Sequence, residues 1–284
     1  MAMGEALKTA NLAASQRELE NLQSCPICAS KRIQPAPVQP TPPFGVMHCS
    51  DCYAVFLSPR PRIEDMSSFY EEMYDEEREK SSRQERRAQK HVKRLAQMMR
   101  TPGHVLEVGA GDGYFLKAAR DIGWNVTGLE LSPPRIAKAR EWFGLELIDK
   151  DLIAANLPAE SFDVIAMYQL IEHVHDPAAI LRCVHGLLRP GGLLMLSTPN
   201  VLSYARKKRD VNSWMIPQHL FFFSPLSLVN VAEKTGFRVM RPSLLMQAKL
   251  ERRMQWKPWS AMPMTGLLRD LLTPFALRLI AKKI

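Results

Sequence analysis

The stretch His104-Val-Leu-Glu-Val-Gly-Ala-Gly-Asp-Gly113 decides how this chain is interpreted. Its apolar start predicts a short strand, and its three glycines at alternate positions predict a tight turn that a ligand can approach closely. The amphipathic run that begins at Tyr114 predicts a helix, whose free N–H groups would face the turn. The stretch therefore predicts a strand, a turn and a helix at a ligand site.

The glycine spacing separates this turn from that of dinucleotide-binding enzymes. Gly109-x-Gly111-x-Gly113 differs from the Gly-x-Gly-x-x-Gly that approaches a pyrophosphate. Glu107 lies just before the turn, where a carboxylate would repel a pyrophosphate but suit a ligand with an ammonium group. Many such turns are glycine-rich for packing reasons alone, so the turn by itself indicates a ligand site of unspecified chemistry.

The chain after this stretch alternates between strand and helix patterns. This alternation predicts an α/β fold with a mainly parallel sheet and helices on both faces. Ligands of such sheets bind at the carboxyl ends of the strands, so the glycine turn, Glu130, Asp151 and the loop after Tyr168 are expected on one edge. The predicted strands are 104–108, 124–130, 145–148, 162–168, 193–197 and a last strand at 244–248, and the predicted helices are 114–122, 133–143 and 177–188.

Four of the five cysteines form two Cys-x2-Cys pairs, Cys25 with Cys28 and Cys49 with Cys52. Two such pairs, joined by a proline-rich loop, can place four thiolates around one Zn²⁺. Because four sulfurs fill a tetrahedron, His48 is interpreted as a bystander, and the site is expected to be structural rather than catalytic.

Length and composition exclude some classes of protein. The chain has 284 residues, of which 46% are hydrophobic, and no apolar run approaches the roughly 20 residues that span a bilayer. The first 22 residues lack the apolar region of a signal peptide, so we expect a cytoplasmic protein. The net charge of +9 is compatible with nucleic acid, with an anionic membrane, or with solvated helix faces alone.

Residues 104–242 resemble class I S-adenosylmethionine-dependent methyltransferases. Four motifs in order carry this resemblance: Glu107–Gly113, the acidic residue Glu130, the fourth-strand motif 161–177, and the turn Leu188-Arg-Pro-Gly-Gly192. The resemblance implies a Rossmann-like methyltransferase sheet with helices on both faces and S-adenosylmethionine as cofactor.

A finer resemblance extends beyond these motifs. The zinc-ribbon cysteines, Leu57-Ser-Pro-Arg-Pro61, Thr198-Pro-Asn200 and His219-Leu-Phe-Phe-Phe-Ser224 resemble a bacterial subgroup of zinc-ribbon methyltransferases, often associated with cell-surface glycan, lipid or secondary-metabolite modification. The core is also similar to ubiquinone-pathway O-methyltransferases. The expected segments are an N-terminal tail (1–22), a zinc-ribbon-like segment (23–58), a helical linker (59–101), the methyltransferase domain (102–249) and an amphipathic, helical C-terminal tail (250–284).

The resemblance assigns roles to the residues on the predicted edge. Glu130 would bind both ribose hydroxyls, Glu107 would face the ammonium group, and Asp151 would meet the adenine amino group. Leu131 and Leu152 would flank the adenine ring, and Tyr168 and Gln169 would line the mouth near the sulfonium. The expected cofactor-binding residues are Glu107, Gly109, Ala110, Gly111, Gly113, Glu130, Leu131, Asp151, Leu152, Tyr168 and Gln169.

Transfer to a hydroxyl or an acidic carbon requires a base. We favour His219, which lies in the predicted substrate lid 200–224, and then His173 after the fourth strand; a reaction without a protein base is the third alternative. In the ubiquinone-pathway enzymes this motif supplies two glutamates and a histidine to a divalent metal. Gln169 stands at the first glutamate's position, which argues against dependence on Mg²⁺.

The expected activity is methyl transfer to oxygen or carbon of a small molecule, a sugar or a lipid-linked glycan. An RNA methyltransferase is the alternative, since a zinc site and a basic surface suit RNA, but Tyr168-Gln-Leu-Ile stands where base-methylating enzymes carry Asn-Pro-Pro-Tyr. A non-catalytic binding module is the second rival. The tail would pack on the body, on a second subunit of a homodimer, or peripherally on the anionic inner membrane.

Overall fold

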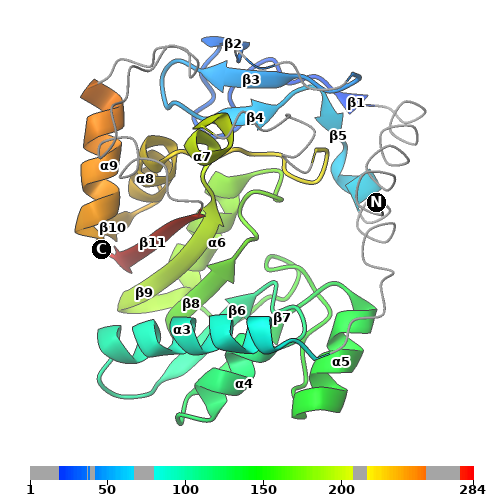
Figure 1. Cartoon of the computed structure of the whole chain (residues 1–284), viewed down its shortest axis with the longest axis vertical. Helices are drawn as coiled ribbons and strands as arrows, with labels where there is room; N and C mark the ends of the chain where they lie inside the picture. Colours follow the sequence, from blue (N-terminus) through cyan, green and yellow to red (C-terminus); the bar gives the residue numbers. More distant parts are fainter. Residues whose placement is uncertain (1–18, 37, 39–41, 67–79, 207–215, 254–275) are drawn as a thin grey trace.

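The computed structural model describes residues 19–36, 38, 42–66, 80–206, 216–253 and 276–284 (Figure 1). A six-stranded sheet with the order β10-β11-β9-β8-β6-β7 forms its centre. The strands are β6 (His104–Val108), β7 (Asn125–Leu129), β8 (Phe162–Tyr168), β9 (Leu188–Pro199), β10 (Phe237–Val239) and β11 (Ala276–Lys283).

The sheet is parallel from β7 to β9 and antiparallel at β11. Strand β6 pairs in parallel with β7 and β8, β8 pairs in parallel with β9, and β11 runs antiparallel between β9 and β10. Strand β8 has the predicted bounds, because its run of apolar residues is buried on both faces, as in parallel sheets. The α/β fold class is confirmed.

Helices cover both faces of the sheet, as expected. Figure 1 shows α3, α4 and α5 on one side and α6, α8 and α9 on the other. The first group shares a core with Val105 and Val164, and the second shares one with Leu106 and Ile165, because successive side chains of a strand point to opposite faces. The helices are α3 (Ser82–Met98), α4 (Tyr114–Arg120), α5 (Pro133–Phe143), α6 (Pro177–Leu187), α7 (Val201–Arg206), α8 (Pro225–Lys234) and α9 (Pro242–Arg253), with a short 3-10 helix η1 (Ile63–Asp65). Among the described residues, no helix has the length and apolar character needed to cross a membrane.

The cysteine-bearing segment forms a small module that packs against the face of the sheet covered by α6, α8 and α9. Its strands are β2 (Ile33–Pro35), β3 (Val46–Cys49) and β4 (Val55–Leu57), and β1 (Leu19–Glu20) pairs with β5 (Arg60–Pro61). Residues 220–222 bond to β4 through Leu57 N–H to Leu220 O and Phe222 N–H to Val55 O, both at 2.9 Å. These bonds hold the module against the sheet, and the buried side chains of both form one hydrophobic core.

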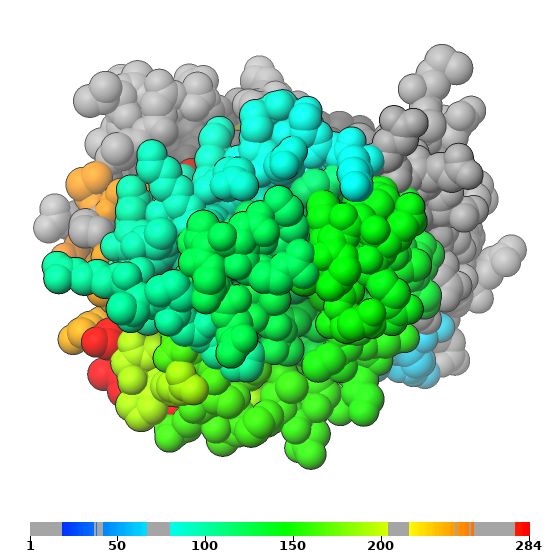
Figure 2. Space-filling view, turned by 90° about the horizontal axis from the view of Figure 1, so that it is seen from below, coloured from blue at the N-terminus to red at the C-terminus, as the bar shows by residue number. Residues whose placement is uncertain are grey.

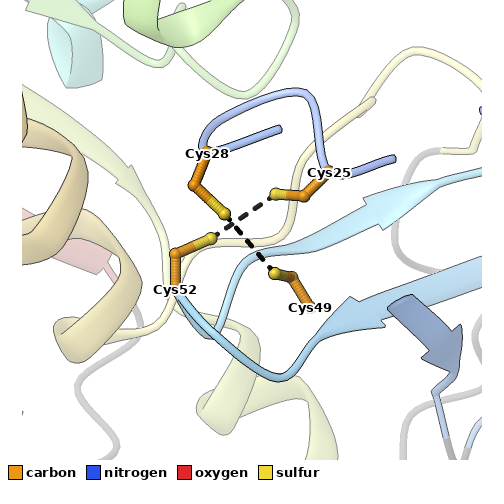
Figure 3. A group of neighbouring side chains, drawn as sticks. All are labelled: Cys25, Cys28, Cys49 and Cys52. Atoms are coloured by element: carbon orange, nitrogen blue, oxygen red, sulfur yellow. Dashed lines mark hydrogen bonds between the residues drawn. The ribbon is translucent and has the colours of Figure 1, made fainter. Parts of the chain in front are cut away.

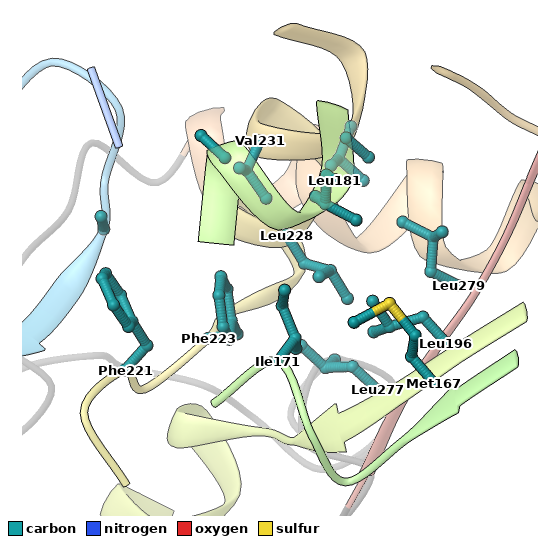
Figure 4. Packing of buried hydrophobic residues seen from close by; sticks show 14 of the residues in the cluster. Met167, Ile171, Leu181, Leu196, Phe221, Phe223, Leu228, Val231, Leu277 and Leu279 are labelled. Atoms are coloured by element: carbon teal, nitrogen blue, oxygen red, sulfur yellow. The ribbon is translucent and has the colours of Figure 1, made fainter. Parts of the chain in front are cut away.

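The seam between the module and the sheet is filled by aromatic side chains. The rings of Phe56 and Phe221 lie 6.2 Å apart, and those of Phe221 and Phe223 stack at 5.9 Å. Figure 4 shows Phe221 and Phe223 packed beside Ile171 and Leu228. The prediction that Phe221–Phe223 belong to a substrate lid is therefore wrong, since all three are buried in this core. Residues 207–215 of the predicted lid lie outside the described part of the chain.

The predicted helical C-terminal tail is wrong for residues 276–283. These residues form β11, in which Leu277, Leu279 and Ala281 are buried and the residues between them are less so. This alternation suits a strand, and seven of the residues pair with β9. The domain boundary at 249 is wrong for the same reason, because β11 is part of the sheet. The rest of the tail, 254–275, lies outside the described residues.

Two smaller predictions also fail. The expected strand at 244–248 is part of helix α9, whose Leu244 and Ala248 are buried against the sheet one helical turn apart. The expected strand at 145–148 is reduced to a single bridge between Ile148 and Leu129. Within the predicted helical linker, 59–101, β5, η1 and α3 are described and residues 67–79 are not.

Candidate functional site

The glycine turn follows β6 and begins α4. Gly109, Gly111 and Gly113 all have positive φ, between 57° and 82°. A Cβ on Gly113 would lie 2.8 Å from the side chain of Leu145, so both its backbone angle and its surroundings require glycine. The N–H groups of Gly109 and Ala110 donate to Leu129 O, each at 2.9 Å. These bonds hold the turn against the end of β7.

Glu130 joins the end of β7 to the glycine turn. Its Oε2 accepts from Gly111 N–H at 2.7 Å, and its Oε1 accepts from Leu131 and Ser132 N–H, each at 3.0 Å. Each carboxylate oxygen has two lone pairs, so Oε2 can accept a further hydrogen bond from a ligand hydroxyl. The two motifs that the sequence linked are therefore in direct contact.

Glu107 places a second carboxyl below the same turn. It is 4% exposed, and its Oε2 has no hydrogen-bond partner among the described residues. Burial, and then the charge of Glu130, raise its pKa well above the ordinary value. A buried acidic oxygen without a partner is costly, and a ligand with an ammonium group would satisfy it. The residues present thus fit S-adenosylmethionine.

Two residues near the turn were missed in the sequence. Asp112 is buried, and its Oδ1 has no partner in the described part of the chain. The Arg135 guanidinium of α5 lies over Gly111, 3.2 Å from the place where a Cβ would be. Asp112 belongs to the motif 107–113, but no role was predicted for it. Arg135 reaches the turn only because α5 packs beside it, so its sequence position gave no signal.

The residues predicted around adenine lie at the same edge with different exposures. Asp151 Oδ1 accepts from the N–H groups of Ile153 and Ala154 at 2.8 Å, which leaves Oδ2 available. Leu131 is 62% exposed, whereas Leu152 is only 3% exposed. The neighbour of Leu152, Ile153, is 63% exposed and was missed. Exposed Leu131 and Ile153 are suited to cover an apolar ring face.

Tyr168 and Gln169 connect this edge to the strands beyond β8. The Tyr168 ring lies 3.9 Å from the ring of His91 and 5.2 Å from that of Phe115, and burial raises the pKa of its phenol. Gln169 has a φ of 55° and donates from N–H to Ser197 O at 2.8 Å. Tyr168 thus packs under α3 and α4; its predicted contact with the sulfonium stays a prediction.

The two predicted base candidates meet beside a third residue. The rings of His173 and His219 lie 4.7 Å apart, edge to face. One ligand atom from each of Glu172, His173 and His219 lies within 4.8 Å of the others. The N–H groups of Leu220 and Phe221 both donate to Glu172 O, which brings His219 to this place. The sequence offered both histidines but gave no sign of their contact.

Protonation in this cluster follows from burial. His173 Nδ1 lies 3.0 Å from Gln218 O, and because a carbonyl only accepts, Nδ1 carries the proton and Nε2 the lone pair. Burial lowers the pKa of His173 to about 4 and raises that of Glu172 to about 8. At neutral pH the cluster therefore combines a neutral imidazole with a protonated carboxyl.

The four cysteines of the module come together (Figure 3). Their Sγ atoms are 3.4 Å apart for Cys25 and Cys52 and 3.6 Å apart for Cys28 and Cys49. A disulfide would require about 2.05 Å, whereas tetrahedral zinc bonds of about 2.3 Å correspond to sulfurs about 3.8 Å apart. The arrangement therefore fits a tetrahedral metal ion, and His48 lies outside this group of ligand atoms.

Comparison with known proteins agrees with this geometry. Residues 75–241 match a family described as a methyltransferase domain. A probable S-adenosylmethionine-dependent methyltransferase of Mycolicibacterium smegmatis is 32% identical over 136 residues, 48% of this chain and 52% of its own. A ubiquinone biosynthesis O-methyltransferase of Pseudomonas aeruginosa is 36% identical over 102 residues, 34% of this chain and 44% of its own. The chain spans about half the length of the curated relatives it matches.

Solved structures support the fold. An S-adenosylmethionine-dependent methyltransferase from Archaeoglobus fulgidus superimposes with a TM-score of 0.52 at 18% identity, covering 70% of this chain and 94% of that one. A Pyrococcus horikoshii protein gives 0.53 at 17% identity, covering 72% of this chain and 92% of its own. At such identities the likeness concerns the arrangement of helices and strands.

Proposed function

Since this chain belongs to the methyltransferase domain family, we propose that it transfers a methyl group from S-adenosylmethionine to oxygen or carbon of a small molecule, a sugar or a lipid-linked glycan. The observation that carries the proposal is the pair of acidic residues at the glycine turn. Glu107 is buried with an unpartnered oxygen, and Glu130 is bonded to Gly111. A ligand with one ammonium group and two ribose hydroxyls suits this pair.

The residues of the edge divide the work of binding. Glu107 would hold the ammonium group, Glu130 the ribose hydroxyls, and Asp151 the adenine amino group. Bound S-adenosylmethionine supplies a methyl group on a sulfonium, and transfer leaves the electron pair of the broken carbon–sulfur bond on sulfur. The residues of this edge would act mainly by holding the methyl carbon and the sulfur in line with the acceptor atom.

Removal of the acceptor's proton falls to the histidine cluster. His173 is neutral at pH 7 because its pKa is about 4, and its Nε2 holds the lone pair. His219, the base candidate favoured from the sequence, lies 4.7 Å away from ring to ring. As the acceptor hydroxyl bonds to the methyl carbon, its proton would pass to one of these imidazoles. The O-methyltransferase among the relatives is consistent with an oxygen acceptor.

The four-cysteine module would hold one structural Zn²⁺. Four sulfurs leave the ion no open position for a substrate, so it would contribute folding energy rather than chemistry. The module's contacts with residues 220–222 suggest what it stabilises, namely the segment that carries His219. Cytoplasmic location, peripheral membrane contact and pairing with a second subunit are further parts of the proposal.

Calorimetric titration with S-adenosylmethionine tests the cofactor assignment. Glu130→Ala should weaken binding by about 1–3 kcal/mol, because it removes charge-assisted hydrogen bonds. Glu141→Ala, on the exposed side of α5, is the matched control and should bind as the wild type does. Equal affinity of the two variants would contradict the assignment.

The acceptor class can be tested independently. Incubation with the cofactor and cell extracts, followed by mass spectrometry, should reveal a mass gain of one methyl group on a small molecule or glycan. Methylated RNA, together with nucleic-acid binding that falls steeply with salt, would instead favour the RNA alternative.

A further inference from the structure

A shallow hollow lies between helix α3 and the antiparallel end of the sheet. Three arginines from separate elements line it: Arg94 of α3, Arg241 from the turn before α9, and Arg278 of β11. We call it the arginine hollow. His91 and Tyr168 also line it. Figure 2 views the molecule from the side of α3, where red atoms of the C-terminal strand and orange atoms of α9 emerge beyond the cyan helix.

The fold directs these side chains toward one another. Leu277 and Leu279 are buried on the face covered by α6 and α8, so the alternation of β11 turns Arg278 to the face of α3. Arg94 follows His91 by three positions, hence on the same side of α3. Arg241 lies over β11, where its guanidinium Nη1 donates to Arg278 O at 3.4 Å.

Nothing in the described part of the chain balances this charge. No aspartate or glutamate lines the hollow, and none of the three arginines forms an ion pair with a described residue. Burial and then Arg94 lower the pKa of Arg241, and burial followed by Arg94 and Arg241 lowers that of Arg278. Other arginines of the chain have acidic partners: Arg60 with Glu20 and Arg189 with Asp163.

The hollow adjoins the edge where methyl transfer is proposed. Tyr168 and Ser197 line it, and Ser197 also accepts from Gln169, through its carbonyl at 2.8 Å and its hydroxyl at 3.4 Å. Tyr168 contacts Phe115, which lies two residues after the glycine turn. A molecule with an anionic group in the hollow could therefore extend to this edge from the side of α3.

We propose that the arginine hollow binds a phosphate or diphosphate group of the acceptor substrate. Planar guanidinium groups bind phosphate oxygens in pairs, and three of them suit an anion with several oxygens better than a single carboxylate. The proposal rests on the proposed function, since it assigns the substrate class of the same edge. It selects phosphorylated acceptors, such as a nucleotide-linked or lipid-linked sugar, over neutral ones.

Binding of inorganic pyrophosphate to the full zinc-loaded chain, without the methyl donor, tests the hollow directly. Arg94→Ala and Arg278→Ala should each weaken binding roughly tenfold. Arg182→Ala, an exposed arginine on α6 at the other face of the sheet, is the matched control and should leave it unchanged. The pyrophosphate affinity of Arg278→Lys should lie between those of the wild type and Arg278→Ala, because lysine keeps the charge but loses the paired donors. Pyrophosphate binding that is absent, or equally affected by all variants, would overturn the proposal.

Cofactor titration of the same variants keeps the result interpretable. Arg94 lies on the surface of helix α3, so Arg94→Ala should retain the wild-type affinity for S-adenosylmethionine. A retained affinity would show that the variant has folded. If the wild type binds pyrophosphate but not the methyl donor, the proposed function fails while the hollow stands. If it binds only the methyl donor, the hollow fails alone.

Vesicles distinguish a lipid headgroup from a soluble phosphate. The chain is mixed with phosphatidylglycerol vesicles and, for comparison, with phosphatidylcholine vesicles. Binding to the anionic vesicles that pyrophosphate displaces and Arg94→Ala weakens would identify a lipid-borne phosphate. Pyrophosphate binding without vesicle binding would identify a soluble one. Vesicle binding that is unchanged by Arg94→Ala, in a chain that does not bind pyrophosphate, would contradict the proposal.

Discussion

The glycine-turn edge and the arginine hollow lie on either side of Tyr168 and carry opposite charges. The edge gathers carboxyl groups, of which Glu107 and Asp112 have buried oxygens without hydrogen-bond partners among the described residues. The hollow gathers Arg94, Arg241 and Arg278 without carboxylates. Acidic groups thus outnumber Arg135 at the edge, whereas only basic charges line the hollow. On the two proposals above, one sheet would bind an ammonium group on one side of Tyr168 and a phosphate on the other.

The glycine-turn edge and the cluster of His173 and His219 also differ in the elements that hold them. The cofactor edge is built by consecutive elements from β6 to α5. His219 and its neighbours are held by the four-cysteine module and by Phe221 and Phe223 at the seam. Mutations that unfold the module should therefore disturb the cluster of His173 and His219 and leave the glycine-turn edge intact.

Loss of the metal should have the largest effect. Structural zinc contributes about 10–16 kcal/mol to the folding of small metal-bound units, so Cys49→Ser should abolish stoichiometric zinc and loosen residues 23–58 and 216–224. Hydrogen exchange reports the loosening, and calorimetry should show nearly unchanged S-adenosylmethionine affinity. Cys183→Ser, outside the four-sulfur group, is the control. One zinc per chain retained in Cys49→Ser would sink the metal assignment.

Glu107 should have the next largest effect. Burial raises its pKa well above the ordinary value, so it keeps its proton to a higher pH than an ordinary glutamate does. Binding of an ammonium group should ionise it, so the cofactor should bind more tightly as the pH rises, with release of a proton. Glu107→Gln should weaken binding by about 1.5–3 kcal/mol and abolish that proton release. Calorimetry in buffers of different ionisation enthalpy measures both; unchanged proton release would exclude Glu107 as its source.

Glu172 should affect the pH dependence of stability, with a modest effect for each pH unit. Its pKa is about 8 in the folded protein against an ordinary value of 4.5. Between these values the unfolded chain has lost the proton that the folded chain keeps, so stability should fall by about 1.4 kcal/mol per pH unit. Glu172→Gln should remove this slope in denaturant titrations. Burial raises the pKa of Glu251 to about 7, so Glu251 adds a similar slope below that pH. Glu251→Gln should remove only this second slope and serves as the comparison.

The cofactor edge could be predicted because its signals are local. The glycine turn, the acidic residue after the second strand and the apolar run of β8 each specify a structure within a few residues, and strand β8 matched its predicted bounds. The Asp176 cap was equally local, with its side chain accepting from Ala179 N–H at the start of α6.

Strand β11, the contact between the two histidines and the arginine hollow could not be predicted, because the parts of each are distant in sequence. Leu277, Ile280 and Ala281 have a helical spacing, whereas Leu277, Leu279 and Ala281 alternate as in a strand. Only pairing with β9, some 80 residues earlier, decides between the two. The contact of His173 with His219 depends on hydrogen bonds from residues 220 and 221 to Glu172. The arginine hollow draws one residue from each of three elements, so no motif announces it.

Strand β11 lies between β9 and β10, although β10 is synthesised first. During synthesis, therefore, β9 presents an apolar edge without a neighbour, and β10 has no place in the sheet, until the residues of β11 have been made. Unpaired edges of this kind attract other chains. Expression of a fragment that stops at the domain boundary suggested by the sequence, residue 249, should for this reason give aggregated protein, and refolding of the full chain should be most sensitive to concentration before β11 joins the sheet.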